Sequence, residues 1–423
     1  MAFTEAAAIA LLSEAVGASP IRDSALEAPD KRARRLLRAR SRAAFSKRWS
    51  TKLANHDLRP TIGVLAEHFS GERRVALVPA DVRRLSRVAK FTVEHRAAAE
   101  AGHPDAAYVE SGAALAERRT IASTSHVIIG VRAPSDLSNL QPGTLLVSLG
   151  GRDEGVTRAA SAQGLKHLGL ERLPRTARAQ AMDVLSSQAT VAGYAAVIEC
   201  ARALDVLLPM LTTAAGGIKP AKMIALGAGV AGLQAIATAR RLGAVVHGFD
   251  VREATREQVE SLGARFVSPG EALKVWEAAN GYASDQSAQE QAALRRAIGP
   301  ILAQMQLIVT SAQIPGRPAP LLIDDETLAG LLPGTVIVDL AVEAGGNTSR
   351  TVPGETLTEG RVKIIGAVNL PSQMAADASR LFSGNVRALL EHLIPDEAGL
   401  RLRLDDPITA ALLGVDQAQR SAA

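Results

Sequence analysis

Three glycines and one acidic residue have the types and spacing needed to hold a phosphate-containing ligand. The sequence GAGVAG places Gly227, Gly229 and Gly232 between a strand-like apolar run and a helix-like run, and Asp250 closes the next strand-like run. In this pattern the glycines permit a tight turn, a close approach to a pyrophosphate and close packing of the helix on the strand. The helix N-terminus donates to phosphate, and the acid accepts from ribose hydroxyls. The ordered pattern therefore predicts a dinucleotide site.

The acid also indicates which dinucleotide binds. A carboxylate at Asp250 would repel a 2′-phosphate, which favours NAD(H) over NADP(H). Val230 opens the helix, and Val251 and Arg252 follow the acid, so we include all three in the predicted site. A contact between Arg252 and a phosphate stays open as an alternative.

A second group of polar residues stands in LPRTARAQAMDVLSSQ, residues 173–188. The segment offers Arg175, Gln180, Asp183 and Ser186, and it contains no His, Lys, Cys or Glu. Amides, guanidinium and carboxylate groups orient a bound ring but supply no proton donor near neutral pH. Enzymes that transfer a hydride to or from alcohols or amino acids usually need a proton donor near the nicotinamide, and this segment offers none. For Asp183 a second interpretation is open, because an acid at a helix start favours the helix dipole without any ligand.

The elements that must position these residues alternate between strand and helix. Strands are predicted at 61–67, 91–95, 126–131 and 144–149, with a helix over 79–90, and a second series of strands follows. That second series lies at 221–226, 244–250, 307–312, 335–341 and 362–367, with a helix over 230–243. Such alternation is typical of α/β folds with largely parallel sheets. A long helix is predicted within 181–206, and another over 378–392.

This pattern predicts two Rossmann-like parallel-sheet domains that flank a cleft and are joined by long helices. The first domain covers 61–182 and is completed by 368–423, and the dinucleotide domain covers 183–367. Residues 268–287 are long for a connection in a compact fold, and we expect a functional loop there.

Composition and charge exclude several classes of function. The chain has 423 residues, 47% hydrophobic, and one cysteine, Cys200, so it contains no internal disulfide. Residues 31–52 hold ten Lys or Arg and no acid, whereas the chain from residue 53 carries 37 basic and 38 acidic residues. The body is therefore nearly neutral, and nothing indicates nucleic-acid binding. No apolar run is long enough to span a membrane, and no metal site is predicted. Residues 1–60 are expected to be a poorly ordered extension, with an organelle transit peptide as the alternative.

From about residue 61 onward the sequence resembles the NAD(H)-binding alpha subunit of proton-translocating NAD(P)+ transhydrogenase. This subunit belongs to the same superfamily as alanine dehydrogenase. The segments that carry the resemblance are GERRVALVP (71–79), PRTARAQAMDVLSSQATVAGY (174–194), KMIALGAGVAGLQAIATARRLGA (222–244), DVREATREQVESLGARF (250–266), PGRPAP (315–320), VIVDLAVEAGGN (336–347) and AADAS (375–379).

The resemblance implies roles for individual residues. Gln180 would hold the dihydronicotinamide towards the partner's cofactor, with Arg175, Asp183 and Ser186 around it, whereas Arg178 would be a neighbouring structural contact. Gly281 and Tyr282 would cover the bound NAD(H) as a lid. Gln313 would lie beside the cofactor, at a position where the family is expected to have leucine.

The resemblance also implies an assembly. NADP(H) would bind a separate beta subunit, membrane-spanning subunits would translocate protons, and the chain would form a homodimer through its NAD domain. Its place would be cytoplasmic, peripheral at the cytoplasmic face of the inner membrane.

Two alternatives remain open. An alanine-type amino-acid dehydrogenase needs an Arg, a Lys, a catalytic His and an Asp. Of these the chain offers Arg74, while Arg132 replaces the Lys, residues 146–152 offer no His where the catalytic one is expected, and Glu343 replaces the Asp. Arg74 is then expected to be a structural ion-pair partner. The other alternative is a non-catalytic NAD-binding regulatory subunit.

Overall fold

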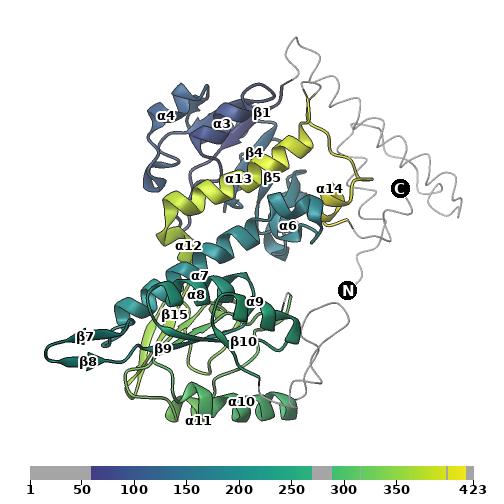
Figure 1. The fold of residues 1–423 in the computed structure, drawn as a ribbon. Helices are drawn as coiled ribbons and strands as arrows, with labels where there is room; N and C mark the ends of the chain where they lie inside the picture. The colour runs from purple at the N-terminus through teal and green to yellow at the C-terminus, as the bar shows by residue number, and fades with distance from the viewer. Residues whose placement is uncertain (1–58, 269–287, 315, 397–398, 416–423) are drawn as a thin grey trace, which may run out of the picture. The chain divides into compact units, whose positions relative to one another are not determined.

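The computed structural model describes residues 59–268, 288–314, 316–396 and 399–415 (Figure 1). The predicted extension up to residue 58 and most of the predicted loop at 268–287 lie outside the described residues, and so do Gly281 and Tyr282. Two sheets with flanking helices confirm the predicted α/β class.

The first sheet has six parallel strands in the order β3-β2-β1-β4-β5-β6. Side chains of α3 and α13 share the core on one face of this sheet, and those of α5 and α6 cover the other face. The bounds are β1 Thr61–Val64, α3 Pro79–Leu85, β2 Lys90–Glu94, α4 Asp105–Glu110, β3 Ala114–Ala116, α5 Arg118–Thr124, β4 Val127–Arg132, β5 Leu145–Leu149, α6 Glu154–Ala162 and β6 Lys166–Gly169.

The second sheet has seven strands in the order β11-β10-β9-β12-β13-β15-β14, of which only β14 runs antiparallel. Its core side chains come from α7, α8 and α9 on one face and from α10 and α11 on the other. The bounds are β9 Lys222–Leu226, α8 Val230–Arg241, β10 Val245–Phe249, α9 Arg256–Ser261, β11 Arg265–Phe266, α10 Ala288–Leu302, β12 Leu307–Thr310, α11 Asp325–Ala329, β13 Val336–Asp339, β14 Thr356–Glu359 and β15 Val362–Gly366.

One long helix connects these cores, and a second packs in the first of them. Helix α7 (Val184–Ala203) places Val184 in the core of the first sheet and Cys200 in that of the second. Helix α13 (Ala375–Leu393) packs in the first core, where the Ser379 and Ser383 hydroxyls accept hydrogen bonds from the backbone N–H groups of Val75 and Val78 at 3.0 and 2.9 Å. The C-terminal helix therefore returns to the first sheet.

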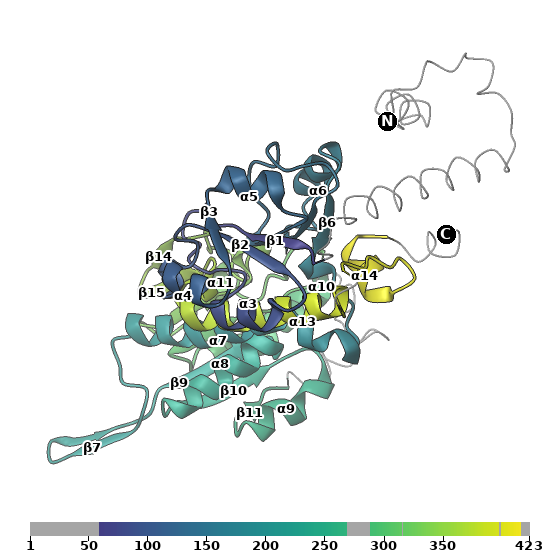
Figure 2. The same cartoon turned by 90° about the horizontal axis from the view of Figure 1, so that it is seen from above.

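Some predicted boundaries were wrong. The strand predicted over 61–67 ends at Val64, and the helix predicted over 79–90 ends at Leu85. Residues 86–89 form a turn that leads into the next strand, and Lys90 already pairs with Thr61 in the sheet. A hairpin of β7 (Leu211–Thr213) and β8 (Gly216–Ile218), which the sequence did not reveal, extends from the second sheet region in both views (Figures 1 and 2).

Candidate functional site

The glycine turn follows β9 and opens α8, as predicted. Gly227 has φ +100°, which side-chain-bearing residues rarely adopt, and its carbonyl accepts a hydrogen bond from the Ser311 hydroxyl at 3.2 Å. A Cβ at Gly232 would collide with the Gly227 carbonyl, so this position requires glycine for close packing. The first and third glycines thus have the structural roles that the pattern predicts.

Gly229 is different because a Cβ there would meet no atom within 4 Å. It is the N-cap residue of α8, and no side chain caps the helix there. The first N–H groups of a helix have no partner within the helix and attract anions. A glycine facing open space beside an uncapped helix start fits a pyrophosphate that approaches the backbone.

Asp250 is buried, with 6% of its surface exposed, and its carboxylate is engaged. It accepts the Ala228 N–H at 2.8 Å, the Arg252 N–H at 2.9 Å and two guanidinium bonds from Arg252 at 2.9 Å each. The carboxylate therefore fixes the glycine turn and also neutralises Arg252. Val251 packs against the core that α10 and α11 form with the second sheet.

The loop that precedes α7 is arranged as a helix start. Arg175 and Gln180 are exposed, and Gln180 lies in the 3₁₀ segment Ala177–Met182. Asp183 is the N-cap residue of α7, where it accepts the Ser186 N–H at 3.0 Å and the Ser186 hydroxyl at 2.6 Å. Arg178 lies 3.6 Å from Asp406, which confirms its expected structural contact. The capping interpretation of Asp183 is thus borne out, and a cofactor contact stays a prediction.

Helix α7 lies directly against α8. A Cβ at Gly193 would collide with the Ala231 carbonyl, so the two helices approach as closely as their backbones allow. Ala231 stands in the first turn of α8, next to Val230, which is 43% exposed. This contact holds the helix that begins with Asp183 in a fixed relation to the glycine turn.

Gln313 lies in the loop after β12 (Leu307–Thr310), where its amide donates to the Leu340 carbonyl at 3.1 Å. The sequence analysis missed the residue that organises this loop, Asn347. Its side chain accepts the Ala312 N–H at 3.1 Å and donates to the carbonyls of Ala312 and Pro320 at 2.9 and 2.8 Å. The sequence did offer one signal for Asn347, which is that this polar residue directly follows the glycine pair at 345–346.

Arg74 takes part in a buried ion pair, as expected. Its guanidinium donates to both Glu72 oxygens at 2.7 and 2.6 Å, to Gln188 at 2.8 Å and to Asn369 at 3.0 Å. Burial pushes the pKa of Glu72 upward, but the hydrogen bonds and charge of Arg74 outweigh it and hold that pKa below its usual range. Sequence reasoning did not assign Gln188 or Asn369, because their partners are distant in the chain.

Other candidate groups do not form a site. His247 lies in β10 and is partly buried, and burial lowers its pKa. Among the described residues, no three His, Cys, Asp or Glu side chains gather to hold a metal ion. No helix in the described ranges is both long and apolar enough to cross a bilayer.

Comparison with known proteins assigns both halves of the chain. Residues 63–192 match the family described as "Alanine dehydrogenase/PNT, N-terminal domain", and residues 196–421 match "Alanine dehydrogenase/PNT, C-terminal domain". The chain is 40% identical over 358 residues to an NAD(P) transhydrogenase subunit alpha polypeptide of Rhodospirillum rubrum, with 82% of this chain and 93% of that protein covered.

Two further proteins are similar to this chain over most of its length. The solved structure of a transhydrogenase from Sinorhizobium meliloti shares 39% identity with a TM-score of 0.71, covering 79% of this chain and 94% of the other. An alanine dehydrogenase of Halomonas elongata is 28% identical over 84% of this chain and 92% of its own length.

Proposed function

Because the chain belongs to the alanine dehydrogenase/PNT family, we propose that it is the NAD(H)-binding alpha subunit of a proton-translocating NAD(P)+ transhydrogenase. The relatives of about 40% identity named as transhydrogenase alpha subunits support this proposal over the dehydrogenase branch, where identity is 28%.

The observation that carries the proposal is the close contact of α7 and α8. Gly193 lets α7, which Asp183 caps, lie on the first turn of α8, whose N-cap residue is Gly229. An uncapped helix start for a pyrophosphate and a polar loop for a nicotinamide are thereby fixed on one rigid pair of helices. Rigid placement is what a reaction limited by proximity and orientation requires.

The cofactor would be held mainly by backbone and short side chains. Bound NADH supplies the hydride that is transferred to NADP+ on the partner subunit. Gly229 and Val230 offer the helix start to the phosphates, and Asp250 holds the turn. Four hydrogen bonds already occupy the Asp250 carboxylate, so a ribose hydroxyl would replace one of those from the Arg252 guanidinium. The other residues assigned to cofactor binding are Gly227, Gly232, Val251, Arg252 and Gln313 and, outside the described residues, Gly281 and Tyr282.

The loop before α7 would orient the ring. Gln180 is exposed on the 3₁₀ segment before α7, and we assign it to positioning the dihydronicotinamide. Arg175 would contact the carboxamide or the ribose. Asp183 and Ser186, already joined by two hydrogen bonds, would present a fixed polar edge to the ring.

The assembly follows from this role. NADP(H) binds a beta subunit, separate membrane-spanning subunits carry the protons, and this chain sits on the cytoplasmic face of the inner membrane. The name of the relative, a subunit alpha, supports the need for partners.

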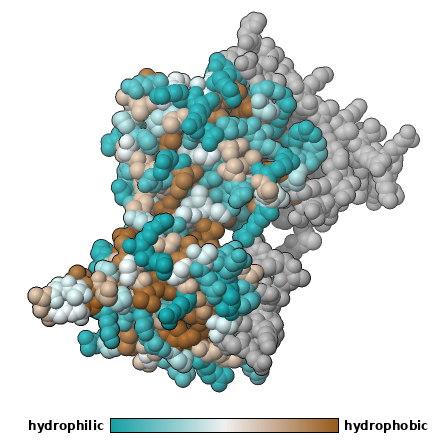
Figure 3. Space-filling model, in the orientation of Figure 1, coloured by the Kyte–Doolittle hydropathy of each residue, from teal (hydrophilic) through white to brown (hydrophobic). Residues whose placement is uncertain are grey.

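We also assign the chain to a homodimer formed through the NAD domain. All six residues of the β7–β8 hairpin are exposed, and a two-stranded hairpin is only marginally stable by itself in water. Met210 and Val206 beside it are 70% and 51% exposed. Figure 3 shows hydrophobic residues gathered where the hairpin leaves the body of the protein. Contact with a second copy would cover them.

The amino-acid dehydrogenase alternative is less well supported. Its carboxylate-binding Arg corresponds to Arg74, and Glu72, Gln188 and Asn369 already occupy the guanidinium of this residue. A non-catalytic regulatory role would leave the polar loop before α7 without a purpose.

A reconstitution experiment separates these functions. The purified chain is mixed with an NADP(H)-binding transhydrogenase domain, and reduction of an NAD+ analogue by NADH is followed. Cyclic transfer that depends on the partner domain and on NADP(H) supports the proposal. Oxidation of alanine by the chain alone would overturn it, and NADH binding without transfer would favour the regulatory alternative.

A further inference from the structure

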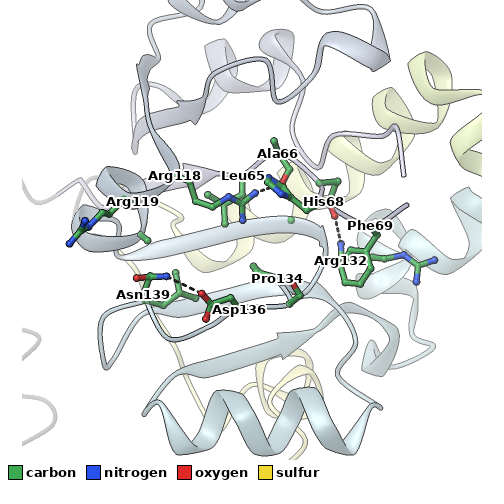
Figure 4. Close-up of a pocket in the computed structure, with 15 residues that line it drawn as sticks. Leu65, Ala66, His68, Phe69, Arg118, Arg119, Arg132, Pro134, Asp136 and Asn139 are labelled. Atoms are coloured by element: carbon green, nitrogen blue, oxygen red, sulfur yellow. Dashed lines mark hydrogen bonds between the residues drawn. The ribbon is translucent and has the colours of Figure 1, made fainter. Parts of the chain in front are cut away.

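A pocket of about 360 Å³ lies at the carboxyl ends of β1 and β4, the switch point of the first sheet (Figure 4). Arg119 and Arg132 lie at its opposite ends and point away from each other. Three carboxylates balance the charge of its arginines. Glu94 and Glu72 lie 2.9 and 3.7 Å from two of them, and Asp136 lines the same pocket. The lining therefore favours neither an anion nor a cation.

The buried acid of this pocket, Glu67, joins two strands. Its carboxyl accepts the backbone N–H groups of Val131 at 2.6 Å and Arg132 at 3.3 Å, so it ties the chain after β1 to the end of β4. Burial raises the pKa of Glu67 to about 7, although both hydrogen bonds oppose this rise. The first sheet region contributes to the proposed reaction through a different element, helix α13.

The loop that carries Gln180 is anchored on both sides of this residue. Ala179 and Met182 are buried in the core of the first sheet, whereas Gln180 is exposed. Between the two buried residues, the Ala181 carbonyl accepts a hydrogen bond from the side-chain amide of Asn385 at 2.8 Å. A buried side chain thus precedes Gln180 and a tethered carbonyl follows it, which restricts the backbone at this position.

Asn385 belongs to α13, and it lies 204 residues beyond the carbonyl that it holds. The helix is fixed in the core of the first sheet, because its Ser379 and Ser383 hydroxyls accept two backbone N–H groups from the segment before α3. Helix α13 is therefore a rigid base for the loop. A change at the Asn385 amide is passed directly to the residue that follows Gln180.

The amide of Asn385 is costly for a contact that only stabilises the fold. Its oxygen is buried and accepts no hydrogen bond from the described residues. The Ala181 carbonyl can only accept, so the NH₂ group must face it and the oxygen must take the covered side. A buried acceptor without a partner disfavours folding, and an apolar side chain of similar size would avoid this cost. What Asn385 does contribute is the hydrogen bond that fixes the loop.

We propose that Asn385 is a positioning residue for hydride transfer, which acts by holding the loop that presents Gln180. The inference rests on the proposed function of that loop. Asn385 acts through Gln180 and contacts neither nicotinamide. Because the reaction depends on proximity and alignment, a small displacement of the group that positions the ring slows transfer strongly. Loss of the Asn385 amide should therefore slow transfer with little change in stability or in NADH affinity.

The test compares Asn385→Leu with the wild-type chain in single-turnover hydride transfer with the NADP(H)-binding partner domain. Leucine has a similar volume but lacks the donor. We expect transfer to slow roughly fivefold or more, while the dissociation constant for NADH changes less than about twofold and the urea midpoint does not fall. The matched control is Asn139→Leu, which removes an exposed hydrogen bond to Asp136 and should leave transfer unchanged.

A double-mutant cycle tests whether Asn385 acts through Gln180. In the Gln180→Asn background, the additional loss from Asn385→Leu should be less than about twofold. Equal fold losses in both backgrounds would overturn the proposal. An unchanged transfer rate in Asn385→Leu, or a slower rate that accompanies a lower urea midpoint, would overturn it as well.

Amide hydrogen exchange separates a failure of this proposal from a failure of the proposed function. Peptides that cover residues 177–183 should exchange faster in Asn385→Leu than in the wild-type chain or in Asn139→Leu, because the loop has lost its tether. If the wild-type chain transfers no hydride with the partner domain, the proposed function fails, and exchange alone decides whether Asn385 holds the loop. Unchanged exchange in Asn385→Leu would overturn the proposal.

Discussion

The two sheets of this protein arrange their first five parallel strands in the same order, but different groups line the switch point of each sheet. In the second sheet only residues 227–229 separate β9 from α8, so the backbone and the helix start are brought to the site. In the first sheet residues 65–78 separate β1 from α3, and side chains such as Glu67 and Arg132 line the crevice instead. A short glycine turn presents main-chain N–H groups, whereas a long connection leaves recognition to side chains.

The same difference extends to what holds each region together. Near the glycine turn, stability depends on the close approach of backbones at Gly232 and Gly193. Near the first switch point it depends on buried charge, with Arg74 only 4% exposed beside Glu72. The glycine turn of the second sheet should therefore be sensitive to the addition of a methyl group. The switch-point region of the first sheet should be sensitive to the loss of a charge.

The largest expected effect is at the buried ion pair. Arg74→Ala leaves the Glu72 carboxylate buried without its partner, which costs roughly 3–5 kcal/mol of unfolding free energy. Arg380→Ala breaks an exposed pair with Asp377 and is expected to cost less than about 1 kcal/mol. Urea unfolding of both variants measures the difference. Equal losses would mean that the region around the first switch point does not depend on buried charge.

The next effect separates two glycines of the turn. Gly232→Ala forces the first turn of α8 away from Gly227, costing roughly 1–3 kcal/mol of stability and also weakening NADH binding. Gly229→Ala adds a methyl group in open space, so stability should stay within about 0.5 kcal/mol. NADH binding to this variant should nevertheless fall at least about tenfold, because the methyl group stands where the pyrophosphate approaches. Unchanged NADH affinity in Gly229→Ala would contradict the placement of the phosphates.

A smaller effect depends on pH. The pKa of Glu67 is raised in the folded protein from 4.5 to about 7, so between these values the folded state holds a proton that the unfolded state has lost. Stability from this group is therefore complete below about pH 4.5 and declines as the pH rises to about 7, by at most roughly 3 kcal/mol. Glu67→Gln should flatten this decline and gain stability relative to wild type at pH 8. Parallel stability curves would show that Glu67 titrates normally.

The smallest expected effect concerns helix caps. Asp183→Ala removes the cap of α7 and Asp153→Ala that of α6, and each should cost about 1 kcal/mol. Only Asp183→Ala should also slow transfer to an NAD+ analogue, because only that cap adjoins the proposed nicotinamide site. Equal transfer rates in the two variants would reduce Asp183 to a structural residue.

The sequence predicted most of the second sheet and its turn because each feature there is local. Strand, glycines, helix and Asp250 follow one another within thirty residues, and each glycine role can be read from spacing. The pocket in the first sheet could not be predicted, since Glu67, Arg118 and Arg132 meet only when three elements fold together. The hairpin at 211–218 was missed for a different reason, because its strands are short and show no buried alternation.

The central claim is that the loop before α7 positions a nicotinamide and supplies no proton. Its most direct test is the single-turnover rate of hydride transfer in Gln180→Asn with the NADP(H)-binding partner domain, measured beside the dissociation constant for NADH. Gln141→Asn, an exposed glutamine before β5, serves as the matched control. We predict a loss of at least about tenfold in the transfer rate, with NADH affinity changed less than about threefold. Equal losses in rate and affinity, or no loss in rate, would contradict the positioning role.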